Sequence, residues 1–271
     1  MKRGQAQQFN WIFIMIVGII ILLFFLGFLV KYLDLQESKE NAEIARGFSN
    51  SILSMKGTEQ YKNSSFDFPF GVIYDCENII VNEEMRFKMP YTISMDEFNS
   101  DELVYWVKEY RKGFLVDRVV FISDKKTKYY FDESFVDGIP PKVKNLLLTS
   151  SLQEADVIVS SSLTGEGKKN VLVQSGNIDI NGTSFSYDGS DFFVYAAAFS
   201  SPEVFECTQR KLSERFNELK EIYRLRIQQI SMYQNVFCNY NSISNAIASG
   251  DVNGMVSLNN ELANLDCEVV F

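Results

Sequence analysis

Residues with the potential to bind a ligand lie together between positions 160 and 170. The run LTGEGKKN, from Leu163 to Asn170, has two glycines followed by two lysines. A phosphate-binding loop needs its glycines ahead of Lys-Ser or Lys-Thr at the start of a helix. Here Asn170 follows the lysines, and the next residues favour a strand. We therefore interpret this run as a solvated turn.

Three serines, Ser160 to Ser162, follow an apolar run that predicts a buried strand. Ligand sites of α/β proteins often lie just beyond the carboxyl end of such a strand. No G-x-S-x-G motif surrounds these serines, and the chain contains no histidine, the usual base that activates a serine. We interpret them as turn formers. A small molecule bound near Ser160–Thr164 is the alternative.

Acidic residues offer two further kinds of site. Adjacent carboxylates such as Asp132-Glu133 and Asp96-Glu97 resemble the acid and base of a glycosidase, but an acidic surface produces such pairs freely. Oxygen ligands for Ca²⁺ cluster later in the chain, without the spacing or final glutamate of an EF-hand, and hairpin turns account for the same residues: Asn177, Asp179, Asn181, Asp188 and Asp191. We expect no catalytic residue, no metal site, no cofactor and no enzyme activity.

The segment 11–32 is predicted to be a transmembrane helix. Trp11 to Val30 is a run of twenty residues without a charge, and at about 1.5 Å per residue it spans roughly 30 Å, one hydrocarbon core. A secretory signal has a shorter apolar region followed by small residues at a cleavage site. The residues Lys31 to Asp34 do not form such a site.

Flanking charges predict the orientation of this span. Lys2 and Arg3 precede it, whereas basic and acidic residues are mixed after it, so residues 1–10 are expected to be a basic cytoplasmic leader and the bulk of the chain extracytoplasmic. Without these two cations, 24 basic side chains stand against 35 acidic ones, a net charge of −11. This charge argues against nucleic acid and anionic lipid headgroups as partners.

The cysteines agree with an outer location. None lies in the span and none forms C-x-x-C, and their even number favours two disulfides, with three connectivities open among Cys76, Cys207, Cys238 and Cys267. Sequons at Asn63 and Asn181 are compatible with glycosylation of the same outer surface.

The elements that must position these residues fall into three parts. Residues 33–58 lack proline and place apolar side chains at spacings of three and four, which predicts an amphipathic stalk helix that continues from the span and ends near Gly57. Residues 61–71 suggest a linker. The head, residues 70–200, is predicted to be an α/β (α+β) domain with a mixed sheet.

Within the head, apolar and β-branched runs predict strands. These runs cover residues 71–81, 86–94, 117–123, 128–132, 155–162, 169–175 and 191–199. A helix is expected over residues 100–113, with Ser100 as its N-cap and Gly113 just beyond its end, and a second near 140–150. Asn-Gly and Asp-Gly pairs predict one or two hairpins within 177–193.

The last part, residues 201–271, is predicted to be a disulfide-braced helical hairpin. No proline or glycine occurs between Glu203 and Ala248, and the apolar spacing indicates one helix of about 45 residues. A turn near residue 251 leads into a shorter return helix. In such a hairpin Cys238 and Cys267 lie within one turn of facing each other, which leaves Cys76 to pair with Cys207.

The residues KRGQ, Lys2 to Gln5, stand directly before the uninterrupted apolar helix. This arrangement resembles the class III signal peptides of archaeal type IV pilin-like proteins, and the resemblance covers about 30 residues. It implies that a membrane prepilin-type peptidase cuts between Gly4 and Gln5, and that the retained helix packs in a filament core. The family usually continues Gln-x-Ser-x-Glu, with the Glu serving subunit registry, whereas this chain has Gln5-Ala6-Gln7-Gln8-Phe9. An ordinary signal anchor is the alternative.

Two functions fit these patterns. The first is a single-pass, membrane-anchored cell-surface protein without enzyme activity, which acts by assembly, by self-association or by contact with other envelope proteins, and which is pilin-like in its processing. The second is a ligand-binding or enzymatic α/β domain tethered to the membrane surface. The absence of histidine and of any complete catalytic motif favours the first.

Overall fold

The computed structural model describes residues 3–57, 61–82, 85–89, 91–162, 164–166, 168–233 and 238–271. It divides the chain into two compact units, Met1–Phe48 and Ser49–Phe271. The second unit is an α+β domain with two mixed sheets, where the sequence predicted one.

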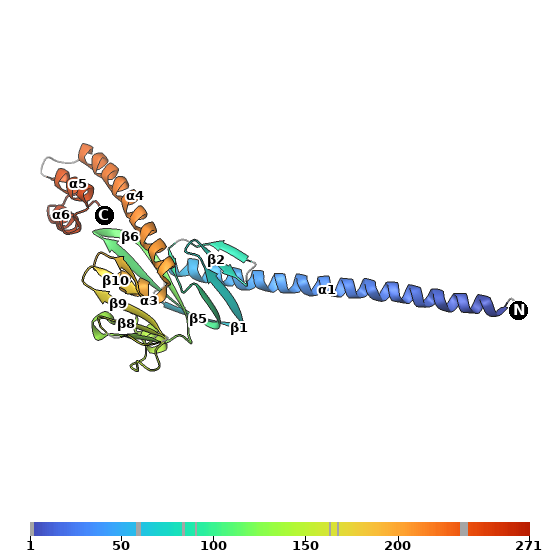
Figure 1. The fold of residues 1–271 in the computed structure, drawn as a ribbon. Coiled ribbons are helices and arrows are strands. Elements are labelled where there is room, and N and C mark those ends of the chain that lie inside the picture. The colour runs from blue at the N-terminus through green and yellow to red at the C-terminus, as the bar shows by residue number, and fades with distance from the viewer. Residues whose placement is uncertain are drawn as a thin grey trace. The chain divides into compact units, whose positions relative to one another are not determined.

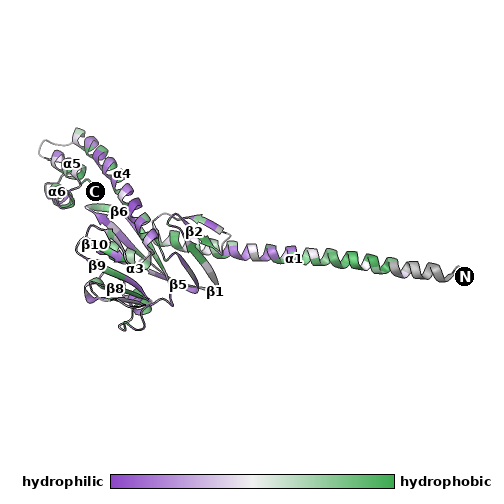
Figure 2. Cartoon of the chain, viewed as in Figure 1, coloured by the Kyte–Doolittle hydropathy of each residue, from purple (hydrophilic) through white to green (hydrophobic). Residues whose placement is uncertain are grey.

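A single helix, α1, runs from Arg3 to Gly57 and includes both the apolar run and the amphipathic segment that follows it. Figure 2 shows the change from an apolar stretch to a mixed polar stretch along α1. The helix ends at Gly57, as predicted. Its last turns belong to the second unit, where Ile52 and Met55 are buried and the Ser51 hydroxyl accepts a hydrogen bond from Lys62.

The first sheet has six strands in the order β3-β2-β1-β5-β6-β4 (Figure 1). All neighbours are antiparallel except β4 and β6, which are parallel. The strands are β1 Tyr61–Tyr74, β2 Asn78–Val81, β3 Met85–Lys88, β4 Thr92–Ile93, β5 Glu97–Lys112 and β6 Phe114–Asp124.

The helix predicted over residues 100–113 is wrong, because this segment is the central strand β5. Leu103 to Trp106 are all fully buried, so both faces of the strand are covered, and strands of that kind read as continuous apolar runs without alternation. Gly113, at φ +81°, forms the tight connection to β6 instead of ending a helix. Ser100 is buried and its hydroxyl accepts from the Glu102 N–H.

The linker predicted over residues 61–71 is also wrong, because these residues form most of β1. The β1–β5 ladder runs from Tyr61 opposite Trp106 to Ser65 opposite Glu102, and resumes after a register shift at Phe70. The domain therefore begins well before residue 70.

The second sheet has five strands in the order β11-β10-β9-β8-β7. Strands β7, β8 and β9 are parallel, and β9, β10 and β11 are antiparallel. The predicted hairpin is present, with Asn181 and Gly182 at positive φ in its turn. The elements are β7 Tyr129–Phe131, η1 Glu133–Phe135, α2 Pro141–Leu147, β8 Val157–Ser160, β9 Lys169–Gln174, β10 Asn177–Ile180 and β11 Thr183–Ser186.

Residues 191–199 form a helix, α3, rather than the predicted strand. Phe192 to Phe199 are all buried, and a short apolar run that is buried on every side does not distinguish a helix from a strand by its periodicity. Helix α3 contacts strands of both sheets. Its Phe199 ring lies 5.6 Å from Trp106 of the first sheet and 4.4 Å from Tyr129 of the second, so α3 forms the centre of the core.

The long helix predicted from Glu203 to Ala248 is wrong in its length. Helix α4 spans Pro202–Tyr233, and α5 is a separate helix, Tyr240–Ser249, capped by the Asn239 side chain. Gly250, in the left-handed conformation, ends α5, and Asp251 caps α6, Val252–Asn264. The turn expected near residue 251 therefore lies between α5 and α6.

Candidate functional site

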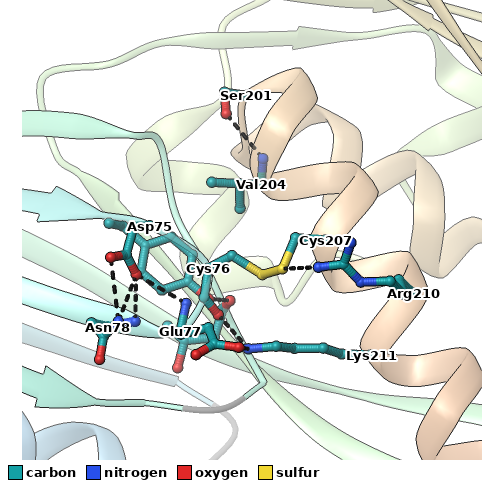
Figure 3. The surroundings of a disulfide bond; sticks show 11 residues. Asp75, Cys76, Glu77, Asn78, Ser201, Val204, Cys207, Arg210 and Lys211 are labelled. Atoms are coloured by element: carbon teal, nitrogen blue, oxygen red, sulfur yellow. Dashed lines mark hydrogen bonds and ion pairs between the residues drawn. A yellow bond between two sulfur atoms is a disulfide. The ribbon is translucent and has the colours of Figure 1, made fainter.

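The first disulfide joins Cys76, in the turn between β1 and β2, to Cys207 on α4 (Figure 3). The two Cα atoms are 6.2 Å apart. One turn further along α4, the Lys211 ammonium donates to the Cys76 carbonyl at 3.0 Å and lies 3.5 Å from the Glu77 carboxylate. The bridge and this lysine together fix the β1–β2 turn on α4.

The turn itself is organised by Asp75. Its carboxylate accepts from the Asn78 N–H at 2.7 Å and from the Arg86 guanidinium at 2.7 Å. Partial burial raises the pKa of the Asp75 carboxyl, but the hydrogen bonds from Arg86 and Asn78 outweigh it and hold the pKa below its usual value. Asp75 is therefore a charged, structural residue.

The second disulfide joins Cys238, ahead of α5, to Cys267, beyond α6, with Cα atoms 6.1 Å apart. The chain end that follows is held by side chains of three helices. Tyr240 donates to the Glu268 carbonyl at 3.0 Å, and Arg226 donates to the Val269 carbonyl at 3.3 Å. Asn259 of α6 donates to the Phe271 carbonyl and accepts from the Val270 N–H, each at 2.8 Å.

Both pairs are those favoured from the sequence, and all four cysteines are used. The role of Asn259 was missed, because a lone asparagine in a helix carries no local signal of the chain end that it binds. Disulfides of this kind persist in oxidising compartments.

The lysines of the run 163–170 do not present their ammonium groups to a phosphate. Lys168 donates to the Leu152 and Gln153 carbonyls at 2.6 and 2.7 Å. Lys169 donates to carbonyls at the end of α3, at 2.6 Å for Ala197 and 2.8 Å for Ala198, and also to Ser200. Lys169 is the first residue of β9 and Lys168 comes directly before it, and both lysines tie this part of the chain to neighbouring backbone.

Lys169 is the most strongly perturbed basic group among the described residues. Burial of its ammonium lowers its pKa to about 7, although the Asp96 carboxylate acts in the opposite direction. The carbonyls that it meets lie at the negative end of α3, where a cation is favoured. Lys169 is thus a half-buried residue whose ammonium caps the end of α3, a role that its sequence neighbours did not reveal.

The serines and aspartates behave as turn formers. Ser160 is fully buried and its hydroxyl accepts from the Ser162 N–H at 3.0 Å, while the Ser161 N–H donates to Asp132. Asp179 accepts from the Gly182 N–H within the hairpin turn. Over the part of the chain that the structure describes, no three His, Cys, Asp or Glu side chains are placed to hold a metal ion.

A cavity of about 310 Å³ lies where β5, α3 and α4 meet the segment after β11. Tyr110 donates to Asp188 at 3.0 Å at its edge, and burial, followed by the charge of Asp188, raises the Tyr110 pKa far above its usual value. The other lining residues combine aromatic rings with polar groups: Lys112, Ser186, Tyr187, Phe193, Gln209, Ser213 and Phe216. These groups can hydrogen-bond a ligand, but they include no activated nucleophile.

The remaining predicted sites are exposed or terminal. Asn63 lies exposed on β1, and Asn181 lies exposed in the β10–β11 turn, where its side-chain oxygen accepts from the Asn170 N–H. Gly4 and Gln5 lie in the first turns of α1.

Comparison with known proteins matched this chain to no protein family, no curated protein and no solved structure.

Proposed function

We propose that this chain is a single-pass, membrane-anchored cell-surface protein that acts by assembly or protein contact. The observation that carries the proposal is the apolar part of α1. Apart from half-buried Val17, the apolar side chains described between Trp11 and Val30 are at least 50% exposed. By length and composition, α1 is the one helix among the described residues suited to cross a membrane.

The disulfides and the flanking charges indicate which side of the membrane each part of the chain occupies. Two disulfides in the unit Ser49–Phe271 fit an extracytoplasmic head. Lys2 and Arg3, ahead of the span, fit a cytoplasmic N-terminus. In this arrangement the amphipathic part of α1 serves as the stalk.

The resemblance at Lys2 to Gln5 makes the assembly pilin-like. A prepilin-type peptidase of the membrane would remove Met1 to Gly4 and leave α1 beginning at Gln5. Helix α1 runs through this position without a break, so cleavage would shorten it by less than one turn. The retained apolar helix would then contact other copies of this chain or other envelope proteins.

The experiment is the intact mass of the protein isolated from its own membranes, with and without reductant. We expect the loss of Met1 to Gly4 and a gain of about four mass units on reduction, two for each disulfide. A Gly4→Val variant should keep the leader, whereas the control Gly18→Val, where no atom lies within 4 Å of an added Cβ, should lose it. A full-length wild-type mass rejects processing, and no gain on reduction rejects the outer location.

A second candidate is a ligand-binding head. The ligand would bind in the cavity beside Tyr110 rather than near Ser160–Thr164. This cavity combines ring faces with hydrogen-bonding groups, as sites for sugars do. Native mass spectrometry of the purified chain tests it. A bound small molecule that is lost in Tyr110→Phe would support this candidate. A chain that carries no ligand and does not bind added mono- or disaccharides would reject it.

A further inference from the structure

Helix α4 carries an exposed apolar stripe on the side that faces away from its own core. Ile222, Leu225 and Met232 are 53%, 55% and 77% exposed. The opposite side of the same helix is buried along its length through Leu212, Phe216, Ile227 and Ile230. The stripe is thus not required to hold α4 on the domain.

The spacing of the stripe is that of a coiled-coil seam. Ile222, Leu225, Gln229 and Met232 follow one another at intervals of three, four and three residues. With Ile222 at position a of a heptad, Leu225 and Met232 occupy d and Gln229 occupies the next a. A polar residue at one a position is a common device for fixing register.

The charges beside the stripe distinguish the two ways in which a second helix can lie on it. Glu221 occupies position g on one flank, and Arg226 occupies position e on the other. In a parallel pair, g of one helix meets the e that follows five positions later on its partner, so Glu221 meets Arg226 of the other copy. In an antiparallel pair g faces g, so Glu221 would meet Glu214, Glu221 or Gln228 of the other copy and would have no cation opposite it.

The ion pairs that these residues already form do not oppose a new pairing. Glu221 contacts Arg224 at 3.0 Å, and Arg226 contacts Glu268 at 3.3 Å. All four side chains are at least 44% exposed, and pairs between exposed groups contribute little to stability.

We propose that a second copy of this chain packs its own α4 stripe in parallel against this one, with Glu221 and Arg226 paired across the interface. The stripe is short, roughly 15 Å from Ile222 to Met232, and three apolar side chains per copy bury far less than the roughly 1,000 Å² of a stable interface in solution. The pairing therefore depends on the membrane anchoring proposed above, which orients the copies alike and raises their local concentration.

The experiment is disulfide cross-linking of full-length chains in their own membranes. Met232→Cys should form a homodimer under mild oxidation, because equivalent d residues meet in a parallel pair. In an antiparallel pair with Ile222 opposite Leu225, the two Met232 positions would be roughly 25 Å apart. The control is Ser231→Cys, an exposed neighbour at position c that should not cross-link. Equal yields for the two variants would overturn the proposal.

Charge variants test the pairing of Glu221 with Arg226. In the Met232→Cys background, Glu221→Arg should reduce the dimer yield at least fivefold, and adding Arg226→Glu should restore it. The control Glu206→Arg makes the same change of charge at an exposed acid of α4 outside the seam, at position f, and should leave the yield unchanged. A cross-link to a protein of another mass would contradict the parallel self-pairing, and so would a dimer yield that Glu221→Arg leaves unchanged.

Anchoring is read separately, from whether the chain stays with the membranes after an alkaline carbonate wash. A washed-off chain refutes the proposed function, whereas an anchored chain that does not cross-link refutes only the α4 pairing.

Discussion

At the scale of single residues, Lys169 shows two opposing effects on one ammonium. Three backbone carbonyls at the end of α3 accept hydrogen bonds from it and favour its charged form, whereas removal from water favours the neutral amine. The loss of hydration is the larger effect, since the pKa falls from 10.5 to about 7. At pH 7 the charged and neutral forms of this ammonium are therefore about equally populated in the folded chain. The free energy of unfolding should then depend on pH above neutrality.

The sign of that dependence follows from proton linkage. Between pH 7 and pH 10 the unfolded chain keeps the Lys169 proton while the folded chain loses it, so the free energy of unfolding should rise with pH, by at most about 1.4 kcal/mol per unit. Lys169→Met should remove this rise. Denaturant unfolding of the disulfide-intact chain at pH 7 and pH 9 measures it.

Lys168→Met is the matched control for that measurement. It removes the neighbouring lysine but keeps Lys169, so the difference between pH 7 and pH 9 should persist in this variant. If wild type and Lys169→Met respond to pH alike, the ammonium of Lys169 is not desolvated as the structure has it.

At the scale of elements, the sequence was most informative where a local signal had one meaning. Asn181-Gly182 predicted the β10–β11 turn because both residues adopt positive φ, which two-residue hairpins require. The end of α1 at Gly57 was also predicted, because a glycine follows the last apolar residues at helical spacing. Signals with two meanings led to errors: Ser100 and Gly113 fit the ends of a helix, but Ser100 lies within β5 and Gly113 forms the connection from β5 to β6.

The other prediction errors concern segments whose structure depends on tertiary contacts. The run Phe192 to Phe199 is equally suited to a strand and a helix by its apolar pattern, and only its place between two sheets makes it α3. The Tyr110–Asp188 pair and the Lys169 cap join residues far apart in the chain. No spacing rule along a single sequence predicts such contacts.

A substitution at Gly113 tests how closely the β5–β6 connection packs against α6. Its φ is +81°, and an added Cβ would lie 2.9 Å from the sulfur and 3.2 Å from the Cβ of Met255 on α6. Gly113→Ala should therefore lower the free energy of unfolding by the strain of a left-handed alanine, about 1–2 kcal/mol, and by a further cost for displacing Met255. Denaturant unfolding gives the total.

Gly176→Ala separates the two costs. Gly176 has φ +78° in the β9–β10 turn, and nothing lies within 4 Å of its added Cβ. This control should show the strain alone. Equal losses in the two variants would mean that Met255 yields freely and that α6 does not press on the β5–β6 connection.

At the scale of the whole molecule, the two disulfides close separate loops of different length. Cys76 and Cys207 are 131 residues apart, whereas Cys238 and Cys267 are 29 apart. The longer bridge joins the first sheet to α4, and the shorter one joins the chain end to α5. Because neither loop contains the other, their effects on the unfolded chain should be nearly independent.

Loop-closure entropy then predicts an order of stability among the serine variants. Removing the Cys76–Cys207 bridge should lower the free energy of unfolding by about 5 kcal/mol, and removing Cys238–Cys267 by about 3.6 kcal/mol. Denaturant unfolding of Cys76→Ser/Cys207→Ser and Cys238→Ser/Cys267→Ser measures both. Should the short-loop variant be the less stable of the two, the contacts of the chain end with Arg226, Tyr240 and Asn259 must depend on its bridge, and packing rather than chain entropy would then govern the C-terminal helices.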